Sequence, residues 1–488
     1  MKLGRFDRKL TAALLAFALS IQLSGCAGSN LLSAADSSSS PAPLSSAASA
    51  DSQQEKPRLP AASSSDSKPS SSAPSTVTSS APPRKAKSES EVQTPQKIPE
   101  TKDSQTVKRL SIQNAASNGF TAVSQSGGYQ ALKTESERTL YKLIENSVYQ
   151  VAVSKTYQNY APTGQISIPG KLTEAEIRLT TTAYLDDHPQ VFWIANAYSY
   201  GYRNDQTILQ LYSELTQSEC SAAVLAFNGK VQSILQSMPS GLGEFDREEY
   251  LFDYITKACS YDDSAVTNKN WKSYTAYGAL IDGKAVCEGY SRAMLLLGGY
   301  AGLSGVLIRG TGEGVAHMWN GFKIDGNWYH VDLTWCDNTN TVYNYFNIDD
   351  KTLKLTHVIA PVASSLTEAQ ICSANAVYNM TLPVCGSTQD NYFRKKGIVI
   401  STLDGSKDDA VVSSVAAQMK QKKTTIAFLI TAADYDATIK GLTTATPYKM
   451  AAYLQKAASA AGVTLSLKNV SYVTDQADLG LNVFVSYQ

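Results

Sequence analysis

The fold of this 488-residue chain is decided by one stretch, GKAVCEGYS at residues 283–291, in which Cys287 directly precedes a helical pattern. Apolar residues recur at spacings of three and four from there to Gly302, as on the buried face of a helix that a glycine ends. Cys287 is therefore predicted in the first turn of a core helix. Free backbone N–H groups and the positive end of the helix dipole favour a thiolate there. A packed structural cysteine fits the same pattern, so a second feature has to decide between the two interpretations.

A predicted hairpin supplies that second feature. Two strand-like runs, 315–324 and 327–334, flank an Asp-Gly pair, which is a strong signal for a two-residue turn. The register that this turn sets makes His317 and Asp332 diagonal neighbours on one face, within side-chain reach. An imidazole held by a carboxylate is the second half of a thiol triad, because the acid fixes the tautomer of the ring and stabilises the imidazolium.

Other interpretations stay open from the residues alone. His330 lies on the same predicted face as Asp332 and competes for the role of base, and Asp337 is a substitute for Asp332. His317 is one of only four histidines and also fits as an ordinary strand residue. Zinc binding is a further alternative, with Cys287, Cys336, His317, His330 and Asp332 as the candidate ligands. No CxxC or HxxxH spacing supports zinc, so no metal is predicted.

The run 273–335 resembles the transglutaminase-like superfamily in its bacterial form. Three motifs of that family stand in the expected order: VCEGY at 286–290, HMWN at 317–320 and WYHVDLTW at 328–335. Shorter segments fit as well, namely Tyr261-Asp262 and YGAL at 277–280. Upstream, DHPQVFW at 187–193 resembles a segment often found before this domain in Gram-positive members.

The resemblance implies an α+β fold with a papain-like core, in which the helix that carries the cysteine packs on an antiparallel sheet. Carried onto this sequence, it makes Cys287 the nucleophile, His317 the general base and acid, and Asp332 the residue that orients His317. Tyr277 and Trp319 are the candidates for an oxyanion-hole donor or a wall of the site. No metal or organic cofactor is implied, and no acidic loop suggests the calcium dependence of some animal relatives.

The N-terminus has the pattern of an export signal at residues 1–26. A basic start precedes an apolar run, 10–23, that is short for a membrane span. The run ends in LSGC at 23–26, which resembles the lipobox of bacterial lipoproteins. By that resemblance Cys26 receives a diacylglyceryl group, becomes the mature N-terminus and anchors the chain outside the bacterial cell membrane. An ordinary cleaved signal peptide with an incidental cysteine is the alternative.

Composition divides the rest of the chain. Residues 27–107 are rich in Ser, Ala and Pro and are predicted to form a disordered linker. An extension of the core is predicted at 108–250, the catalytic domain at 251–375, and a small α/β sandwich at 391–488 as an accessory domain of unknown ligand. Equal numbers of basic and acidic residues, 43 each, argue against nucleic-acid binding. The seven cysteines do not predict a disulfide scaffold, because Cys26 and a nucleophile stay unpaired.

These features together predict an extracytoplasmic, thiol-dependent enzyme. The expected reaction is acyl transfer from a protein or peptide carboxamide to an amine, which is cross-linking, or to water, which is protease or amidase activity. Cell-wall peptides and surface proteins are the partners that a tethered enzyme meets first. The alternative is a non-catalytic surface binding or adhesion module that retains the fold, and a structural spacer is a third interpretation.

Overall fold

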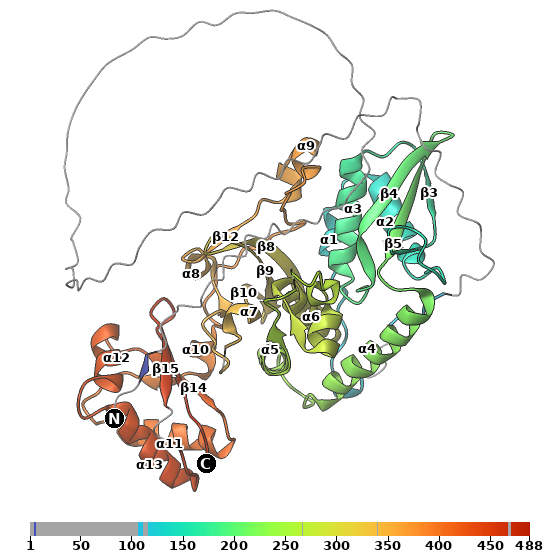
Figure 1. Ribbon diagram of the computed structural model, residues 1–488. Coiled ribbons are helices and arrows are strands. Elements are labelled where there is room, and N and C mark those ends of the chain that lie inside the picture. The colour runs from blue at the N-terminus through green and yellow to red at the C-terminus, as the bar shows by residue number, and fades with distance from the viewer. Residues whose placement is uncertain (1–3, 6–105, 111–115, 266, 339, 467–469) are drawn as a thin grey trace, which may run out of the picture. The chain divides into compact units, whose positions relative to one another are not determined.

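The computed structural model describes residues 4–5, 106–110, 116–265, 267–338, 340–466 and 470–488 (Figure 1). Contacts divide the chain into two units, and the second of them, 26–98, lies outside the described residues. The predicted lipobox, Cys26 and nearly all of the predicted linker lie outside them too. Within the described part of the chain, no helix is both long and apolar enough to cross a bilayer.

The core is a five-stranded antiparallel sheet with a helix packed on it (Figure 1). The strand order is β11-β10-β9-β8-β12. The strands are β8 (Ser304–Gly312), β9 (Val315–Ile324), β10 (Asn327–Val331), β11 (Phe346–Ile348) and β12 (His357–Ile359). Helix α6 (Cys287–Tyr300) packs on β8 and β9, and α5 (Glu244–Ala258) packs against α6. The predicted α+β class, with the cysteine-bearing helix on an antiparallel sheet, is confirmed.

The hairpin of β9 and β10 forms in the predicted register. Asn327 pairs with Ile324 across a turn in which Asp325 and Gly326 have φ of 46° and 89°. Positive φ at both central residues is what a type I′ turn requires, and its twist matches that of the two strands. From this turn the ladder continues to Val331, which pairs with Asn320.

The second strand of this hairpin ends earlier than predicted. Pairing with β9 stops at Val331, so the expectation of a strand to residue 334 is wrong. The physical reason is the side chain of Asp332, whose Oδ1 accepts a hydrogen bond from the backbone N–H of Trp335 at 3.1 Å. That bond caps a short helix, α7 (Leu333–Cys336), and draws the chain out of the sheet.

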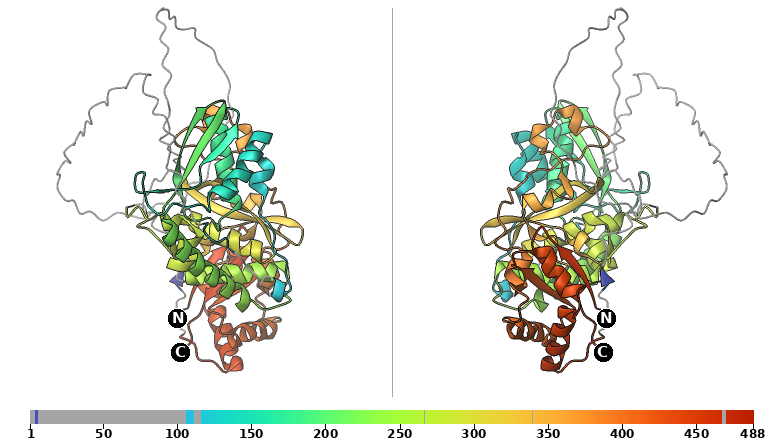
Figure 2. Two further views of the ribbon diagram at one scale, coloured as in Figure 1. Left: turned by 90° about the vertical axis from the view of Figure 1, so that its right-hand side faces the viewer. Right: turned by 90° about the vertical axis from the view of Figure 1, so that its left-hand side faces the viewer.

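Residues before α5 form three helices, a four-stranded antiparallel sheet and a long connecting helix (Figure 2). These elements are α1 (Gly127–Ala131), α2 (Glu135–Ser147), β2 (Ala161–Pro162), β3 (Ile166–Pro169), α3 (Glu174–Asp187), β4 (Ile194–Arg203), β5 (Gln206–Ser213) and α4 (Gln217–Ser237). Helices α2 and α3 begin at capping boxes made by Thr134 and Thr173 with the glutamates three residues on. One hydrophobic cluster runs from these elements into the central sheet, so the extension and the sheet share a core.

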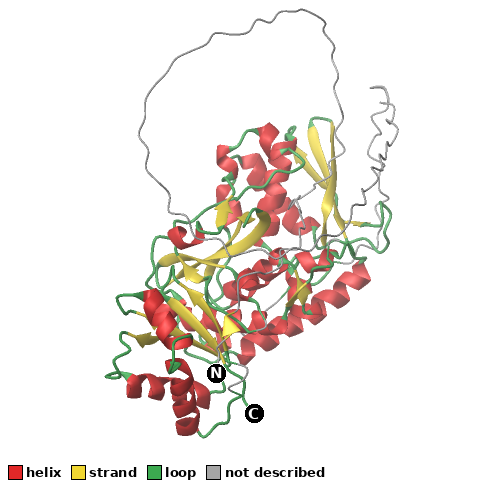
Figure 3. Ribbon diagram, turned by 60° about the vertical axis from the view of Figure 1, so that its left-hand side comes forward, coloured by secondary structure: helices red, strands yellow, loops and turns green. Residues whose placement is uncertain are grey.

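The C-terminal residues form a second hydrophobic core around a mixed sheet, and α11 and α13 pack together; helices are red and strands yellow in Figure 3. Ala427, Leu429 and Phe484 of this sheet belong to the central core. The elements are β13 (Ile398–Ile400), α11 (Asp408–Lys420), β14 (Thr425–Ile430), α12 (Tyr435–Thr443), α13 (Lys449–Ala461), β15 (Ser471–Asp475) and β16 (Gly480–Phe484). A two-residue strand of the predicted leader, β1 (Gly4–Arg5), pairs in parallel with β15. The predicted α/β arrangement is confirmed, although α12 was not expected from the sequence.

Short elements complete the described chain. They are η1 (Ala116–Asn118), β6 (Ser260–Tyr261), η2 (Trp271–Tyr274), η3 (Gly278–Asp282), β7 (Lys284–Ala285), α8 (Asp350–Leu353), η4 (Ala363–Ser365), α9 (Glu368–Ile371) and α10 (Tyr392–Lys396). The six cysteines of the described residues are all free thiols, so no disulfide scaffold is present among them.

Candidate active site

Cys287 is the first residue of α6, and the residue before it caps no backbone group with its side chain. The first N–H groups of the helix therefore remain available around the thiol. Gly289 explains how the helix start comes so close to the preceding loop. A β-carbon at this position would lie 2.5 Å from the carbonyl oxygen of Ser273 and 2.7 Å from the β-carbon of Ala285. The glycine of the VCEGY motif is thus required for packing that positions the thiol.

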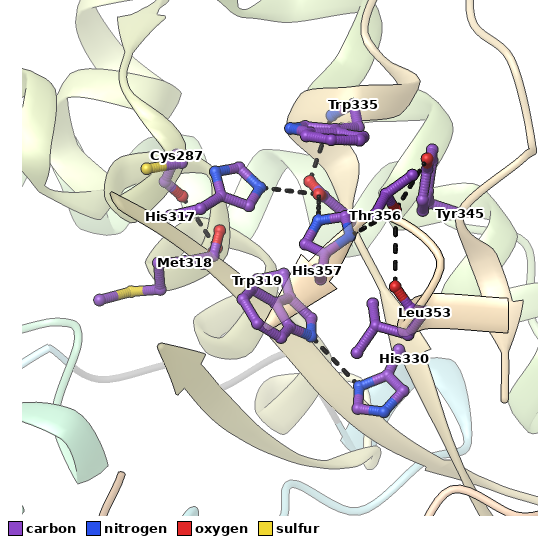
Figure 4. Close-up of polar contacts among 12 residues, drawn as sticks. Cys287, His317, Met318, Trp319, His330, Trp335, Tyr345, Leu353, Thr356 and His357 are labelled. Carbon is purple, nitrogen blue, oxygen red and sulfur yellow. Dashed lines mark hydrogen bonds and ion pairs between the residues drawn. The ribbon is translucent and has the colours of Figure 1, made fainter. Parts of the chain in front are cut away.

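The ring of His317 on β9 lies between Cys287 and a carboxylate (Figure 4). Its Nε2 lies 2.7 Å from Oδ2 of Asp332, and both side chains are buried. Cys287 is among the groups that raise the pKa of this imidazole, so its side chain lies beside the ring. Since Asp332 occupies Nε2, the ring nitrogen that meets the thiol is Nδ1. The three residues proposed from the sequence as a triad are therefore brought together, in the order thiol, imidazole, carboxylate.

The Asp332 carboxylate controls the charge of this pair. Burial alone would lower the pKa of His317, but the charge and hydrogen bond of Asp332, with a further contribution from Cys287, raise it to about 10. Burial would raise the pKa of Asp332, but the charge of His317 and hydrogen bonds from two imidazoles hold it below its usual range. The arrangement favours an ion pair of carboxylate and imidazolium in a site where water is largely excluded.

The rival residues lie elsewhere. Nε2 of His330 hydrogen-bonds to Oδ1 of Asp350 at 2.8 Å, and its Nδ1 accepts from the indole of Trp319. Asp337 accepts a hydrogen bond from the hydroxyl of Tyr290. Burial raises the pKa of Cys336 well above its usual range. Neither His330 nor Asp337 is placed to serve the Cys287 thiol.

The two candidate wall residues have different positions. The ring of Trp319 is fully buried and stacks with that of His317, with centroids 6.0 Å apart. Tyr277 packs instead in an aromatic cluster with Phe192 and Phe227. Among the described tyrosines, those whose pKa values rise partly through the charge of Cys287 are Tyr261 and Tyr274, after burial as the larger cause. Tyr261 is exposed, at 46 %, and Tyr274 is half-buried. The influence of Cys287 on these two pKa values, together with the packing of Tyr277 elsewhere, favours Tyr261 and Tyr274 as side chains beside the thiol.

His357 on β12 is a residue of this site that sequence reasoning missed. Its Nε2 lies 3.2 Å from the same Asp332 oxygen that holds His317 (Figure 4). The ring centroid of His357 lies 4.4 Å from that of Trp335 and 5.0 Å from that of Trp319. No local pattern marks this histidine, because it reaches the site through the pairing of β12 with β8.

Two groups among the described residues have the ligand types and spacing of a metal site. One is His317, Asp332 and His357; the other is His330, Asp350 and Cys385. The second group does not fit a metal. The indole N–H of Trp319 can only donate, so Nδ1 of His330 accepts its hydrogen bond. The proton of the neutral His330 ring therefore lies on Nε2. A protonated nitrogen cannot be a ligand. Neither group includes Cys287 or Cys336, so the zinc site considered from the sequence is not assembled.

Comparison with known proteins bears on the same segment. Residues 232–333 match the family described as the transglutaminase-like superfamily. No curated protein matches the chain. Similar solved structures include a TGase that is 16 % identical, with a TM-score of 0.21. The match covers 36 % of this chain and 52 % of the TGase chain, so this chain spans about half of that protein's length. A candidate cysteine protease from Cytophaga hutchinsonii is 8 % identical, with a TM-score of 0.20 over 43 % of this chain and 73 % of that one. A candidate protease from Parabacteroides distasonis is also 8 % identical, with a TM-score of 0.19 over 60 % of this chain and 61 % of that one.

The family match, and not the likeness to these solved structures, identifies the segment. It begins in α4, includes all of α6 and β9, and ends one residue after Asp332. The VCEGY, HMWN and Asp332 positions of the sequence analysis all fall inside it. The chain therefore contains a domain of the transglutaminase-like superfamily.

Proposed function

We propose that this protein is a cysteine-dependent enzyme that transfers the acyl group of protein or peptide carboxamides to an amine or to water. The single observation that carries the proposal is the position of His317, whose ring lies beside Cys287 on one side and contacts Asp332 at 2.7 Å on the other. A buried histidine with a strongly raised pKa beside a thiol is the arrangement that activates a nucleophile.

The reaction follows from this geometry. The thiolate of Cys287 attacks the carbonyl carbon, the C–S bond forms, and the carbonyl electron pair moves to oxygen, which faces the free N–H groups at the start of α6. As the C–N bond breaks, the imidazolium of His317 gives its Nδ1 proton to the leaving amine. His317 then takes a proton from an incoming amine or water, which attacks the thioester and releases the thiolate. Asp332 stays a carboxylate throughout.

The substrates and the location form the finer part of the proposal. The leader and the LSGC sequence that ends at Cys26 support a lipid-anchored enzyme outside the bacterial cell membrane. An enzyme tethered there has cell-wall peptides and surface proteins as the nearest carboxamides. Hydrolysis and transfer share the same acyl-enzyme, so the acceptor that reaches the thioester decides between them.

A thiol-selective probe tests the enzyme against the non-catalytic binding module. At neutral pH, iodoacetamide should label Cys287 of the full chain at least about tenfold faster than a model thiol, because the thiolate is the reactive form. Residue-resolved mass spectrometry separates this site from the other five described thiols. Cys287→Ala should abolish the fast label and His317→Ala should slow it. Labelling of Cys287 at the rate of the model thiol would reject the enzyme in favour of the binding module.

A second measurement separates the two acceptors. The chain is incubated with a glutamine-containing peptide, with and without a primary amine, and the products are weighed by mass spectrometry. Amine-linked glutamine that disappears in Cys287→Ala indicates a transferase, and deamidated or cleaved peptide with the same dependence indicates a hydrolase.

A further inference from the structure

Asp332 carries more hydrogen bonds than the orientation of one histidine needs. Its Oδ1 accepts from the backbone N–H of Trp335, and its Oδ2 lies within hydrogen-bond distance of two imidazoles, His317 at 2.7 Å and His357 at 3.2 Å. The carboxylate is fully buried and the exposed fraction of the His357 ring is zero. An ionised carboxyl group in such a place is stable only when its oxygens are bonded, and each donor also limits its rotation.

The structure makes room for His357 on the neighbouring strand. His357 pairs with Gly312 of β8, where a β-carbon would lie 2.6 Å from the ring of Trp335 and 3.4 Å from Nε2 of His357. The rings of Trp335 and Trp319 flank the imidazole. A glycine opposite the histidine and two aromatic walls hold the ring at the carboxylate.

Charge balance and hydrogen bonds assign the proton of His357. One buried carboxylate cannot balance two imidazolium ions, and the raised pKa of His317 gives it that charge. His357 is then neutral and donates its Nε2–H to Asp332, so its Nδ1 is an acceptor. The hydroxyl of Thr356 lies 2.9 Å from that nitrogen and the hydroxyl of Tyr345 lies 3.2 Å from Thr356 (Figure 4). A chain of donors from Tyr345 through Thr356 to His357 therefore ends on the carboxylate.

We infer that His357 is a positioning residue of the active site: its Nε2–H fixes the Asp332 carboxylate so that the other imidazole, His317, keeps its proton and its direction toward the thiol. The inference rests on the proposed function, because it assigns a second imidazole to the same triad. His357 has no described contact with Cys287 and acts on the thiol only through Asp332 and His317.

Two substitutions separate hydrogen bonding from packing. His357→Gln keeps an N–H donor at about the same reach, whereas His357→Phe keeps a flat ring and loses the donor. The measurement is the rate of iodoacetamide labelling of Cys287 in the full chain as a function of pH. His357→Phe should label about 10–100-fold more slowly at neutral pH, and His357→Gln should recover most of that rate, as for other outer hydrogen-bond partners. The acid limb of the rate should move to higher pH in His357→Phe, because a less basic His317 supports the thiolate less.

The matched control is His330→Gln, which alters another buried histidine of the same sheet that bonds to Asp350 and not to Asp332. It should change the labelling rate much less than His357→Phe does. The inference is overturned if His357→Phe labels like the unchanged chain, or if His357→Gln is as slow as His357→Phe, since the residue would then act by packing alone.

Nuclear magnetic resonance separates this failure from failure of the proposed function. The chain has only four histidines, so ¹⁵N-labelling of histidine resolves the ring of His317. If Cys287 of the unchanged chain labels slowly, the proposed enzymatic function is rejected. The positioning contact would still be shown if the His317 Nε2 proton exchanged with solvent faster in His357→Phe than in the unchanged chain. If that exchange is unchanged in His357→Phe, the positioning role is rejected whatever the thiol does.

Discussion

Arg309 on β8 and Asp186 near the end of α3 form a buried two-pronged ion pair, with Nη1–Oδ2 at 2.7 Å and Nη2–Oδ1 at 2.6 Å. The exposed fraction of the Arg309 side chain is 2 %. Arg292 of α6 is a second cation at the same carboxylate, at 3.5 Å. The pair joins the extension to the strand that runs directly beside His317, since Gly310 of β8 faces His317.

Removal of the Asp186 charge should destabilise this junction. Asp186→Asn leaves the Arg309 guanidinium buried without its counter-ion, which costs about 3–5 kcal/mol of unfolding free energy. Urea unfolding followed by tryptophan fluorescence measures it, because all five tryptophans lie between residues 193 and 335. The control is Asp205→Asn, which removes an exposed ion pair with Lys171 and should leave the transition unchanged. Equal, small effects of both substitutions would contradict the prediction.

The carboxylate that serves His317 should be distinguishable from its neighbour. Asp332→Asn removes the negative charge that keeps His317 protonated, and activity on a peptide carboxamide should fall by about 10³–10⁴-fold, as when the acid of a comparable triad is replaced. Asp337→Asn alters only the partner of the Tyr290 hydroxyl and should cost far less. If Asp337→Asn lost as much activity as Asp332→Asn, the assignment of this role to Asp332 would be wrong.

The ion pair also predicts how stability depends on pH. The pKa of His317 is raised, to about 10, so its contribution is fully present below about pH 6.5, the unfolded value, and is lost as pH rises through 10. The pKa of Asp332 is lowered, so its contribution is present above about pH 3.9 and is lost as pH falls. The difference in unfolding free energy between the chain and Asp332→Asn should be largest near pH 4–6.5 and should shrink toward pH 10. A difference that is constant between pH 6 and 10 would show that the imidazolium does not form.

The close approach at Gly312 gives a prediction from packing alone. Gly312→Ala places a β-carbon 2.6 Å from the ring of Trp335, so the ring or the strand must move, at a cost of about 1–3 kcal/mol. Since Trp335 contacts both imidazoles at Asp332, thiol labelling should slow as well. The control is Gly229→Ala in α4, where the added carbon meets nothing within 4 Å and helix propensity predicts a gain of about 0.5–1 kcal/mol. If Gly312→Ala changed neither the unfolding free energy nor the labelling rate, the ring of Trp335 would have room to move away from the added carbon.

Local signals account for the parts of the site that the sequence predicts. The turn at Asp325 sets the register of β9 and β10, and the apolar spacing after Cys287 sets the start of α6. Both act over a few residues, so propensity and periodicity describe them well. The contact of His317 with Asp332 was predicted although the strand ends at Val331, because a helix cap directly after the strand keeps the side chain on the same side.

Long-range pairing accounts for what the sequence could not predict. His357 meets Asp332 from 25 residues away through an edge strand of only three residues. Arg309 and Asp186 are 123 residues apart. Such contacts depend on which strands and helices pack together, and no spacing pattern records that choice in a single sequence. The predicted wall residue Tyr277 illustrates the same limit, since only packing reveals that its ring lies with Phe192 and Phe227.

Asp186 precedes the segment that matches the superfamily, and His357 follows it. A fragment trimmed to 232–333 would keep the thiol, the imidazole and the acid, together with the VCEGY and HMWN motifs. It would nevertheless leave Arg309 without its anion and Asp332 without its second imidazole. A survey that takes the presence of Cys287, His317 and Asp332 as evidence of an intact enzyme would therefore accept that fragment. The fragment nevertheless lacks the two residues, Asp186 and His357, whose contacts hold the geometry of the site.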